Sequence, residues 1–152
     1  MVLFLIRHAD ASWSTSGQQT DYNRELSARG KKDLLIMKEQ MIQREWLASR
    51  ILFSPARRTR ATCDGLDLNG EEEESLYLAS ASQIKILVDK HNDSESLMII
   101  CHNPGLIEFV NSFCQGGINH FPTLGICKIE WTDQKHFVSE FIFPDMFPNT
   151  WF

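Results

Sequence analysis

The sequence predicts an α/β fold, a three-layer α/β/α sandwich around a mostly parallel sheet with an antiparallel edge strand. Three observations predict it: short apolar runs typical of buried strands, helical periodicity between those runs, and a hairpin pattern late in the chain. The 152 residues suit one domain, 1–152, and 43% hydrophobic with 23% charged residues exclude a disordered or collagen-like chain. The net charge of −5 favours neither nucleic acid nor a membrane surface as a partner.

The first half of the chain supplies two buried strands and two helices. Residues 2–6 form a continuous apolar run, which is typical of a strand covered on both faces. Ser27 is a favourable N-cap for a helix whose apolar spacing continues to about Leu47. Residues 51–53 predict a second buried strand, and a helix over about 56–63 follows it.

The alternation continues in the second half. Ser80 and Gln83 form the pattern of a capping box, so a helix is expected from there to about residue 91. Residues 97–101 predict a third buried strand. Asn103, followed by a proline, predicts the N-cap of the next helix.

The last strands are predicted at 126–131 and 136–143, with a polar turn between them that indicates a hairpin at one side of the sheet. The acidic run 71–74 is interpreted as a solvated loop. The aromatic tail 141–152 is expected to pack on its own domain, with docking to a partner or a second copy as the alternative.

Four cysteines, Cys63, Cys101, Cys114 and Cys127, are too far apart for a CxxC pair. The apolar run at 2–6 is too short for a signal peptide or a membrane span. The cysteines are therefore interpreted as reduced and mostly buried thiols, which favours a cytoplasmic location.

Cationic side chains follow each of the three predicted buried strands. Arg7 and His8 follow the first, Arg57 and Arg58 lie just beyond the second, and His102 follows the third. Because the carboxyl ends of parallel strands meet at one edge of a sheet, we expect these groups to form an anion pocket, with phosphate as its natural occupant. The exception is Arg57, for which an exposed helical face is the better interpretation.

A histidine in a phosphate pocket has two uses, as a general base or as the nucleophile that carries the phosphoryl group. Crowding by guanidinium groups and a second imidazole would lower its pKa and keep it neutral, as a nucleophile must be. Arginines can then stabilise the phosphoryl oxygens during transfer, so no cofactor and no metal is expected.

The strand-end residues belong to three motifs that occur in order, Arg-His-Ala-Asp-Ala at 7–11, Ser-Pro-Ala-Arg-Arg at 54–58 with Thr62, and Cys-His-Asn-Pro-Gly-Leu at 101–106. Together they resemble the signatures of the histidine phosphatase superfamily, with its phosphoglycerate mutase-like fold, and most closely its short SixA-type branch of phosphohistidine phosphatases. Weaker similarities extend the resemblance from residue 2 to about residue 131, namely at 21–30, 76–80 and 121–123.

The resemblance implies a phosphatase that hydrolyses phosphohistidine on a protein through a covalent intermediate, so the implied partner is a histidine-phosphorylated domain. It implies that His8 is the nucleophile, that Arg7 and Arg58 bind phosphate, and that His102 is the second catalytic and phosphate-binding histidine. Arg58 takes the role rather than Arg57 because of its spacing from the Ser-Pro pair of the motif.

Two positions depart from the usual pattern of the superfamily. Ala9 stands where its members most often have glycine, and Cys101 stands where glycine usually precedes the second histidine. Both side chains are small, so both are expected to be tolerated. A redox role for Cys101 would need a lowered thiol pKa, which the sequence does not indicate.

A general acid is not evident from the sequence. Glu74 and Asp10 are weak candidates, and Glu25 is a third. An alkoxide leaving group needs a positioned acid more than the nitrogen of phosphohistidine does, so this pattern favours a phosphoramidate substrate.

Three other functions are compatible with parts of the pattern. A broader phosphomonoesterase of the same superfamily would act on small phosphate esters. A non-catalytic phosphate-binding module would need the arginines but not His8. A metallohydrolase built on His8 and His102 lacks the usual ligand spacing, and the flanking arginines would repel the metal.

Overall fold

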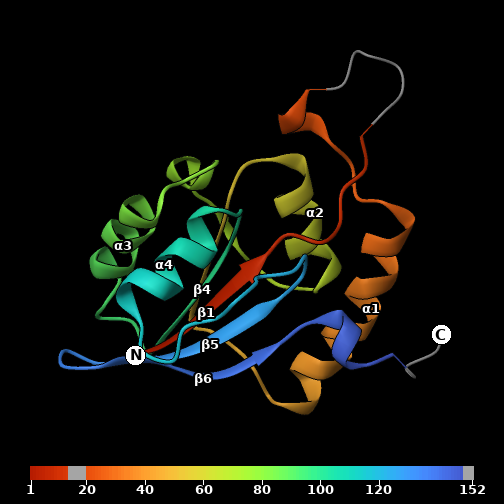
Figure 1. The fold of residues 1–152 in the computed structure, drawn as a ribbon. Coiled ribbons are helices and arrows are strands. Elements are labelled where there is room, and N and C mark those ends of the chain that lie inside the picture. Colours follow the sequence, from red (N-terminus) through yellow and green to blue (C-terminus); the bar gives the residue numbers. More distant parts are fainter. Residues whose placement is uncertain (14–19, 149–152) are drawn as a thin grey trace.

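One six-stranded sheet organises residues 1–13 and 20–148, the part of the chain that the computed structural model describes (Figure 1). Its strands lie in the order β3-β2-β4-β1-β5-β6. Strands β3, β2, β4 and β1 are parallel, and β5 runs antiparallel to both of its neighbours. The antiparallel strand therefore lies one place in from the edge strand β6. The strands are β1 Val2–Arg7, β2 Arg50–Phe53, β3 Glu71–Glu72, β4 Ser96–Cys101, β5 Ile126–Trp131 and β6 His136–Ile142.

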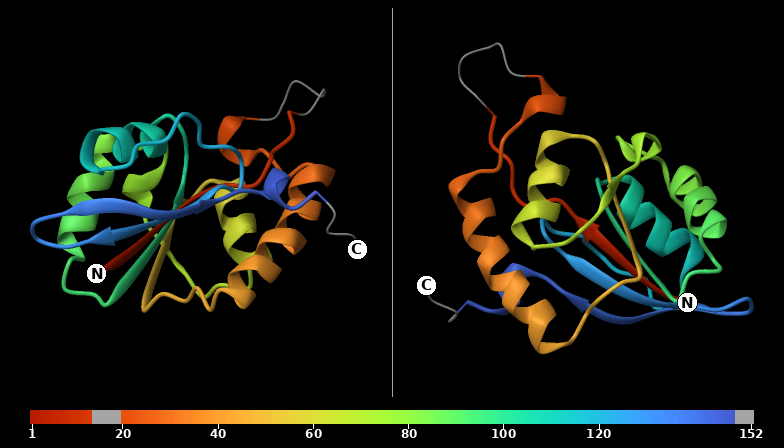
Figure 2. Two further views of the ribbon diagram at one scale, coloured as in Figure 1. Left: turned by 60° about the horizontal axis from the view of Figure 1, so that its bottom comes forward. Right: turned by 180° about the vertical axis from the view of Figure 1, so that it is seen from behind.

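Helices cover both faces of the sheet, as expected for an α/β/α sandwich (Figure 2). α1 and α2 lie on one face, and α3 and α4 lie on the other. Within the described ranges, no helix is long and apolar enough to cross a membrane. The helices are α1 Ala28–Gln43, α2 Arg57–Gly65, α3 Ala81–Lys90 and α4 Gly105–Phe113, with short 3₁₀ helices η1 Asp21–Asn23, η2 Glu74–Leu76 and η3 Pro144–Met146.

The continuous apolar run of β1 arises because the strand contributes to two cores. Leu3 and Leu5 belong to the core beneath α3 and α4, and Phe4 and Ile6 belong to the core beneath α1 and α2. Since successive side chains of a strand point to opposite faces, a strand covered on both sides must be apolar at every position.

The aromatic tail packs on its own domain as far as residue 148. Phe141 is partly buried against the core beneath α3 and α4, and Phe147 is partly buried against the opposite core. Residues 149–152 lie outside the described part of the chain.

The predicted cap of α1 is confirmed, but the helix is shorter than expected. The Ser27 hydroxyl accepts a hydrogen bond from the main-chain N–H of Gly30. The helix then ends at Gln43 instead of continuing to about Leu47. Glu45 has a φ of 56°, a left-handed conformation that a right-handed helix cannot contain.

The start of α4 also differs from the prediction. α4 begins at Gly105 with Pro104 as its N-cap, whereas Asn103 was expected there. The Asn103 side chain instead joins two segments, because its amide donates to the Phe121 carbonyl at 2.9 Å and its oxygen accepts from the Ile107 N–H at 3.3 Å. The capping box of α3, from Ser80 to Gln83, is confirmed.

The acidic run was interpreted as a loop, but Glu71 and Glu72 form the short edge strand β3. Both residues are exposed, and charged residues on a short edge strand oppose further strand pairing. The polar sequence therefore concealed a strand whose main chain alone pairs with β2.

The sheet brings the three motif-bearing strands side by side in the order β2-β4-β1. Their ends remain in register beyond the strands. The N–H of His8 donates to the Cys101 carbonyl at 3.2 Å, and the N–H of Ser54 donates to the Ile100 carbonyl at 3.0 Å. The residues that follow the three strands are thus fixed at one edge of the sheet, as expected.

Candidate active site

His8 follows β1 directly and lies on the floor of the site, only 7% exposed. Its Nδ1 is 2.7 Å from the main-chain oxygen of Ala9. Because a carbonyl can only accept, Nδ1 carries the hydrogen and Nε2 keeps its lone pair. The N–H of Ala9 in turn donates to the Thr62 hydroxyl on α2 at 2.9 Å. The imidazole is therefore held in one tautomer, with Nε2 available as a nucleophile.

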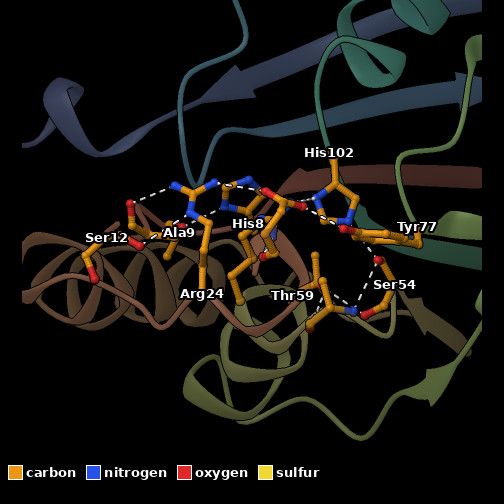
Figure 3. A network of polar contacts seen from close by, with 12 residues as sticks. His8, Ala9, Ser12, Arg24, Ser54, Thr59, Tyr77 and His102 are labelled. Carbon is orange, nitrogen blue, oxygen red and sulfur yellow. Dashed lines mark hydrogen bonds and ion pairs between the residues drawn. The ribbon is translucent and has the colours of Figure 1, made fainter. Parts of the chain in front are cut away.

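His102 follows β4, and its ring centre lies 5.4 Å from that of His8 (Figure 3). The Nη2 of Arg58 donates a hydrogen bond to the Nδ1 of His102 at 3.2 Å. Because a guanidinium has no acceptor atom, the Nδ1 of His102 must accept and carries no hydrogen. The Nε2–H of His102 therefore donates to the Ser54 hydroxyl, at 2.7 Å. Both ring nitrogens thus have protein partners, and the His102 ring supports the guanidinium of Arg58.

Burial is the main cause that lowers the pKa of both histidines. It lowers the pKa of His8 to about 4, with smaller contributions from the guanidinium groups of Arg58 and Arg7. The pKa of His102 falls to about 3, through burial first and then through His8 and Arg58. The expected crowding of cations is present, but removal from water is the larger effect. Both imidazoles are neutral at pH 7.

Two arginines of the predicted set approach the histidines with part of their hydrogen-bonding capacity unused. Arg7 donates to the Phe121 carbonyl at 3.0 Å, and Arg58 is buried at the start of α2. Among the described residues, the Nε atoms of both arginines are buried without a hydrogen-bond partner. Unpaired buried donors are costly, so this pocket favours an anion that would accept from them.

The site also contains three residues that the sequence analysis did not single out: Asp21, Arg24 and Tyr77. The Asp21 carboxylate accepts from the Tyr77 hydroxyl at 2.7 Å, from Arg58 Nη2 at 3.1 Å and, more weakly, from Arg24 Nη1 at 3.4 Å. The Arg24 guanidinium also donates to the carbonyls of Ala11 and Ser12 (Figure 3). Asp21, Arg24 and Tyr77 fall inside the weaker similarities at 21–30 and 76–80, which was the available signal.

Within the described ranges, none of the three candidate general acids forms a hydrogen bond with His8 or His102. The Asp10 carboxylate accepts from the Ser27 hydroxyl at 2.6 Å, at the start of α1. Glu74 is exposed in η2, and Glu25 is exposed and pairs with Arg57 at 2.6 Å. Burial raises the pKa of the Cys101 thiol to about 12, which opposes thiolate chemistry at that position.

Comparisons with known proteins concern the family and the fold of the chain. Residues 3–76 match the family model of the histidine phosphatase superfamily, branch 1. No curated protein matches the sequence. The fold is similar to that of the protein histidine phosphatase SixA in complex with tungstate, with a TM-score of 0.84 and 22% identity over 96% of this chain and 99% of the other.

Two further solved structures share the fold. SixA from Agrobacterium tumefaciens has a TM-score of 0.81 and 22% identity, over 93% of this chain and 97% of that one. A phosphoserine phosphatase from Entamoeba histolytica has a TM-score of 0.65 and 13% identity, over 92% and 95% of the two chains. Residues 3–76 thus match the histidine phosphatase superfamily, and the described part of the chain has the fold of these phosphatases.

Proposed function

We propose that this protein is a phosphohistidine phosphatase that hydrolyses phosphohistidine on a protein through a phosphoryl group carried by His8. The observation that supports it most is the state of His8, a buried, neutral imidazole with a free Nε2 lone pair beside Arg7 and Arg58. A module that only binds phosphate would need the arginines, but it would not need an oriented nucleophile.

In the proposed first step, the Nε2 lone pair of His8 attacks phosphorus and the bond from phosphorus to the leaving group breaks. The guanidinium groups of Arg7 and Arg58 stabilise the phosphoryl oxygens, while His102 holds Arg58 in place. Nδ1 keeps its proton against the Ala9 carbonyl, so the phosphorylated ring can leave as neutral imidazole when water attacks phosphorus in the second step.

The proposal includes catalysis without a metal or cofactor. Side-chain cations supply the positive charge that a metal would otherwise bring to the phosphoryl group. Activity should therefore survive dialysis against a chelator, measured with p-nitrophenyl phosphate. Loss of turnover on chelation, with recovery on adding zinc or manganese, would favour a metallohydrolase instead.

The proposed substrate class is supported by the shared fold with SixA and by the positions of Asp10 and Glu74, which do not serve His8 as an acid. The phosphohistidine nitrogen departs more easily than an alkoxide and depends less on such an acid. The four free cysteines support a reducing, cytoplasmic setting for this activity.

The covalent step is tested by trapping. Brief reaction with 3-phosphohistidine and a quench at alkaline pH should leave one phosphoryl group on His8, located by mass spectrometry of a digest. His8→Ala should lose both the adduct and turnover, and His91→Ala, at the far end of α3, should keep both. Turnover that persists in His8→Ala would exclude the mechanism.

The substrate class is tested by specificity constants. We expect kcat/KM for a histidine-phosphorylated protein to exceed that for a phosphoserine peptide by at least about tenfold, or roughly 1.4 kcal/mol. Equal or better turnover of the ester would make the protein a general phosphomonoesterase of the same superfamily.

A further inference from the structure

The site has a buried floor and a more exposed outer layer. The side chain of Arg58 is 3% exposed, whereas that of Asp21 is 35% exposed. Asp21 begins η1 and Tyr77 follows η2, so two segments that are distant in the sequence meet above the floor. Figure 3 shows Tyr77 beside His102, and their ring centres are 5.8 Å apart.

The Asp21 carboxylate is not suited to donate a proton. Burial alone would raise its pKa, but the hydrogen bond from Tyr77 and the positive charge of Arg58 outweigh that effect and hold the pKa below its usual value. The charged and titratable groups that face it are Arg58 from α2, Arg24 beyond η1, Tyr77 and His102. Asp21 is thus an anion at neutral pH, in a pocket built for anions.

Its position matches that of the leaving group. In an in-line displacement the leaving group departs from the face of phosphorus opposite the nucleophile. Since His8 attacks from the floor, the leaving group lies in the outer layer, where Asp21 lies. One oxygen, Oδ2, is held by Tyr77 and Arg58, whereas among the described residues Oδ1 has only the longer 3.4 Å contact with Arg24.

Building on the proposed function, we infer that Asp21 is the specificity-determining residue of the site. Its Oδ1 accepts a hydrogen bond from the ring N–H of the substrate phosphohistidine. This contact favours the ring that is protonated on the nitrogen not bound to phosphorus. Esters of serine and of p-nitrophenol carry no N–H at that position, so they gain nothing from the carboxylate.

The step balances without an added acid. The His8 Nε2 lone pair forms the new P–N bond, and the electron pair of the broken P–N bond returns to the leaving nitrogen. The leaving ring already carries a proton on its other nitrogen, so it departs as neutral imidazole. A carboxylate that stabilises that N–H replaces the general acid that an alkoxide would require.

Tyr77 is a positioning residue that acts through Asp21. Its hydroxyl fixes Oδ2, while Oδ1 contacts Arg24. Burial, with the neighbouring carboxylate, raises the pKa of Tyr77, so the phenol stays protonated and keeps donating at neutral pH. Loss of this hydroxyl should weaken the same selectivity to a smaller extent.

The test compares 3-phosphohistidine with p-nitrophenyl phosphate in Asp21→Asn. This substitution keeps the main-chain carbonyl of residue 21, which accepts from Arg58 Nη1 at 2.7 Å. We expect the ratio of the two kcat/KM values to fall at least about tenfold. In Tyr77→Phe the ratio should fall two- to fivefold, on the order of 0.4–1 kcal/mol. The matched controls Glu25→Gln and Tyr22→Phe should keep the wild-type ratio.

A pH profile provides a readout that a merely structural role would not move. In the wild type, the alkaline limb of kcat for 3-phosphohistidine should lie at higher pH than in Asp21→Asn, because kcat reports the bound substrate and the carboxylate favours its protonated ring. The alkaline limb of kcat for p-nitrophenyl phosphate should be the same in both proteins.

The outcomes separate this inference from the proposed function. A wild type that does not hydrolyse 3-phosphohistidine would overturn both. The role of Asp21 would be overturned if the wild type hydrolyses 3-phosphohistidine but Asp21→Asn lowers kcat/KM for both substrates by the same factor or leaves both values unchanged. The proposed function would then still stand.

Discussion

Arg57 and Arg58 are sequence neighbours with opposite environments. The side chain of Arg57 is 57% exposed and pairs with Glu25, whereas that of Arg58 is 3% exposed and contacts Asp21 and His102. At the first turn of α2, adjacent side chains point about 100° apart, so one faces solvent and the other faces the site. The spacing argument that selected Arg58 agrees with this geometry.

The two arginines therefore make a matched pair of variants. Arg58→Ala should lower kcat/KM for p-nitrophenyl phosphate by a factor equivalent to about 2–4 kcal/mol of transition-state stabilisation, because it removes a charge-assisted donor to the phosphoryl oxygens. Arg57→Ala should change it by less than about 0.5 kcal/mol, since surface ion pairs contribute little. The reverse ranking would refute the assignment.

At the scale of elements, the connection from β4 into α4 depends on a close approach of two backbones. A Cβ at Gly105 would lie only 2.0 Å from the carbonyl oxygen of Ala79, in the segment that leads into α3. Ala79 is itself near Tyr77, so this contact ties the segment carrying His102 to the segment carrying Tyr77. Only glycine permits that distance, because the atom opposite is main chain and has little freedom to move.

Gly105→Ala should therefore lower both stability and activity. We expect the free energy of unfolding to fall by about 1–3 kcal/mol, as in other overpacked sites, although alanine is the better helix former. Ser112→Ala, on the exposed face of the same helix, should stay within about 0.5 kcal/mol of the wild type. Urea denaturation measures the free energy of unfolding of both variants. Equal stability of the two variants would contradict the close contact.

At the scale of the whole molecule, burying two neutral imidazoles makes folding sensitive to acid. In the unfolded chain both histidines titrate near 6.5, whereas in the folded protein the pKa of His8 is about 4 and that of His102 about 3. Between pH 6.5 and about 4 the unfolded chain therefore binds more protons than the folded protein. Stability from this source is complete above pH 6.5 and is lost as the pH falls.

We expect the free energy of unfolding to drop by on the order of a few kcal/mol between pH 7 and pH 4.5, at about 1.4 kcal/mol per pKa unit. Asp33 opposes the trend slightly, because burial raises its pKa. Urea denaturation at pH 7, 5.5 and 4.5 measures the slope. His8→Gln should flatten it, and a wild-type stability that does not change with pH would contradict the neutral buried pair.

Local signals determined much of the architecture from the sequence alone. Continuous apolar runs identified the buried strands because β1 and β4 are covered on both faces. The N-caps Ser27 and Ser80 could be predicted because an N-cap side chain accepts a hydrogen bond from a main-chain N–H only three residues further along the chain. His8, Arg58 and His102 were predictable together because parallel strands bring their carboxyl ends to one edge.

The outer layer of the site and the strand β3 depend on contacts between distant parts of the chain. Asp21 meets Arg58 across 37 residues and Tyr77 across 56, and no local pattern encodes contacts of that range. The strand at Glu71–Glu72 pairs through its main chain, which side-chain patterns do not report. Local hydrogen bonding and apolar periodicity therefore made the fold and the floor of the site predictable from the sequence. The groups that would face the leaving group were decided by long-range packing, because their positions depend on how η1 and η2 come together over the sheet edge.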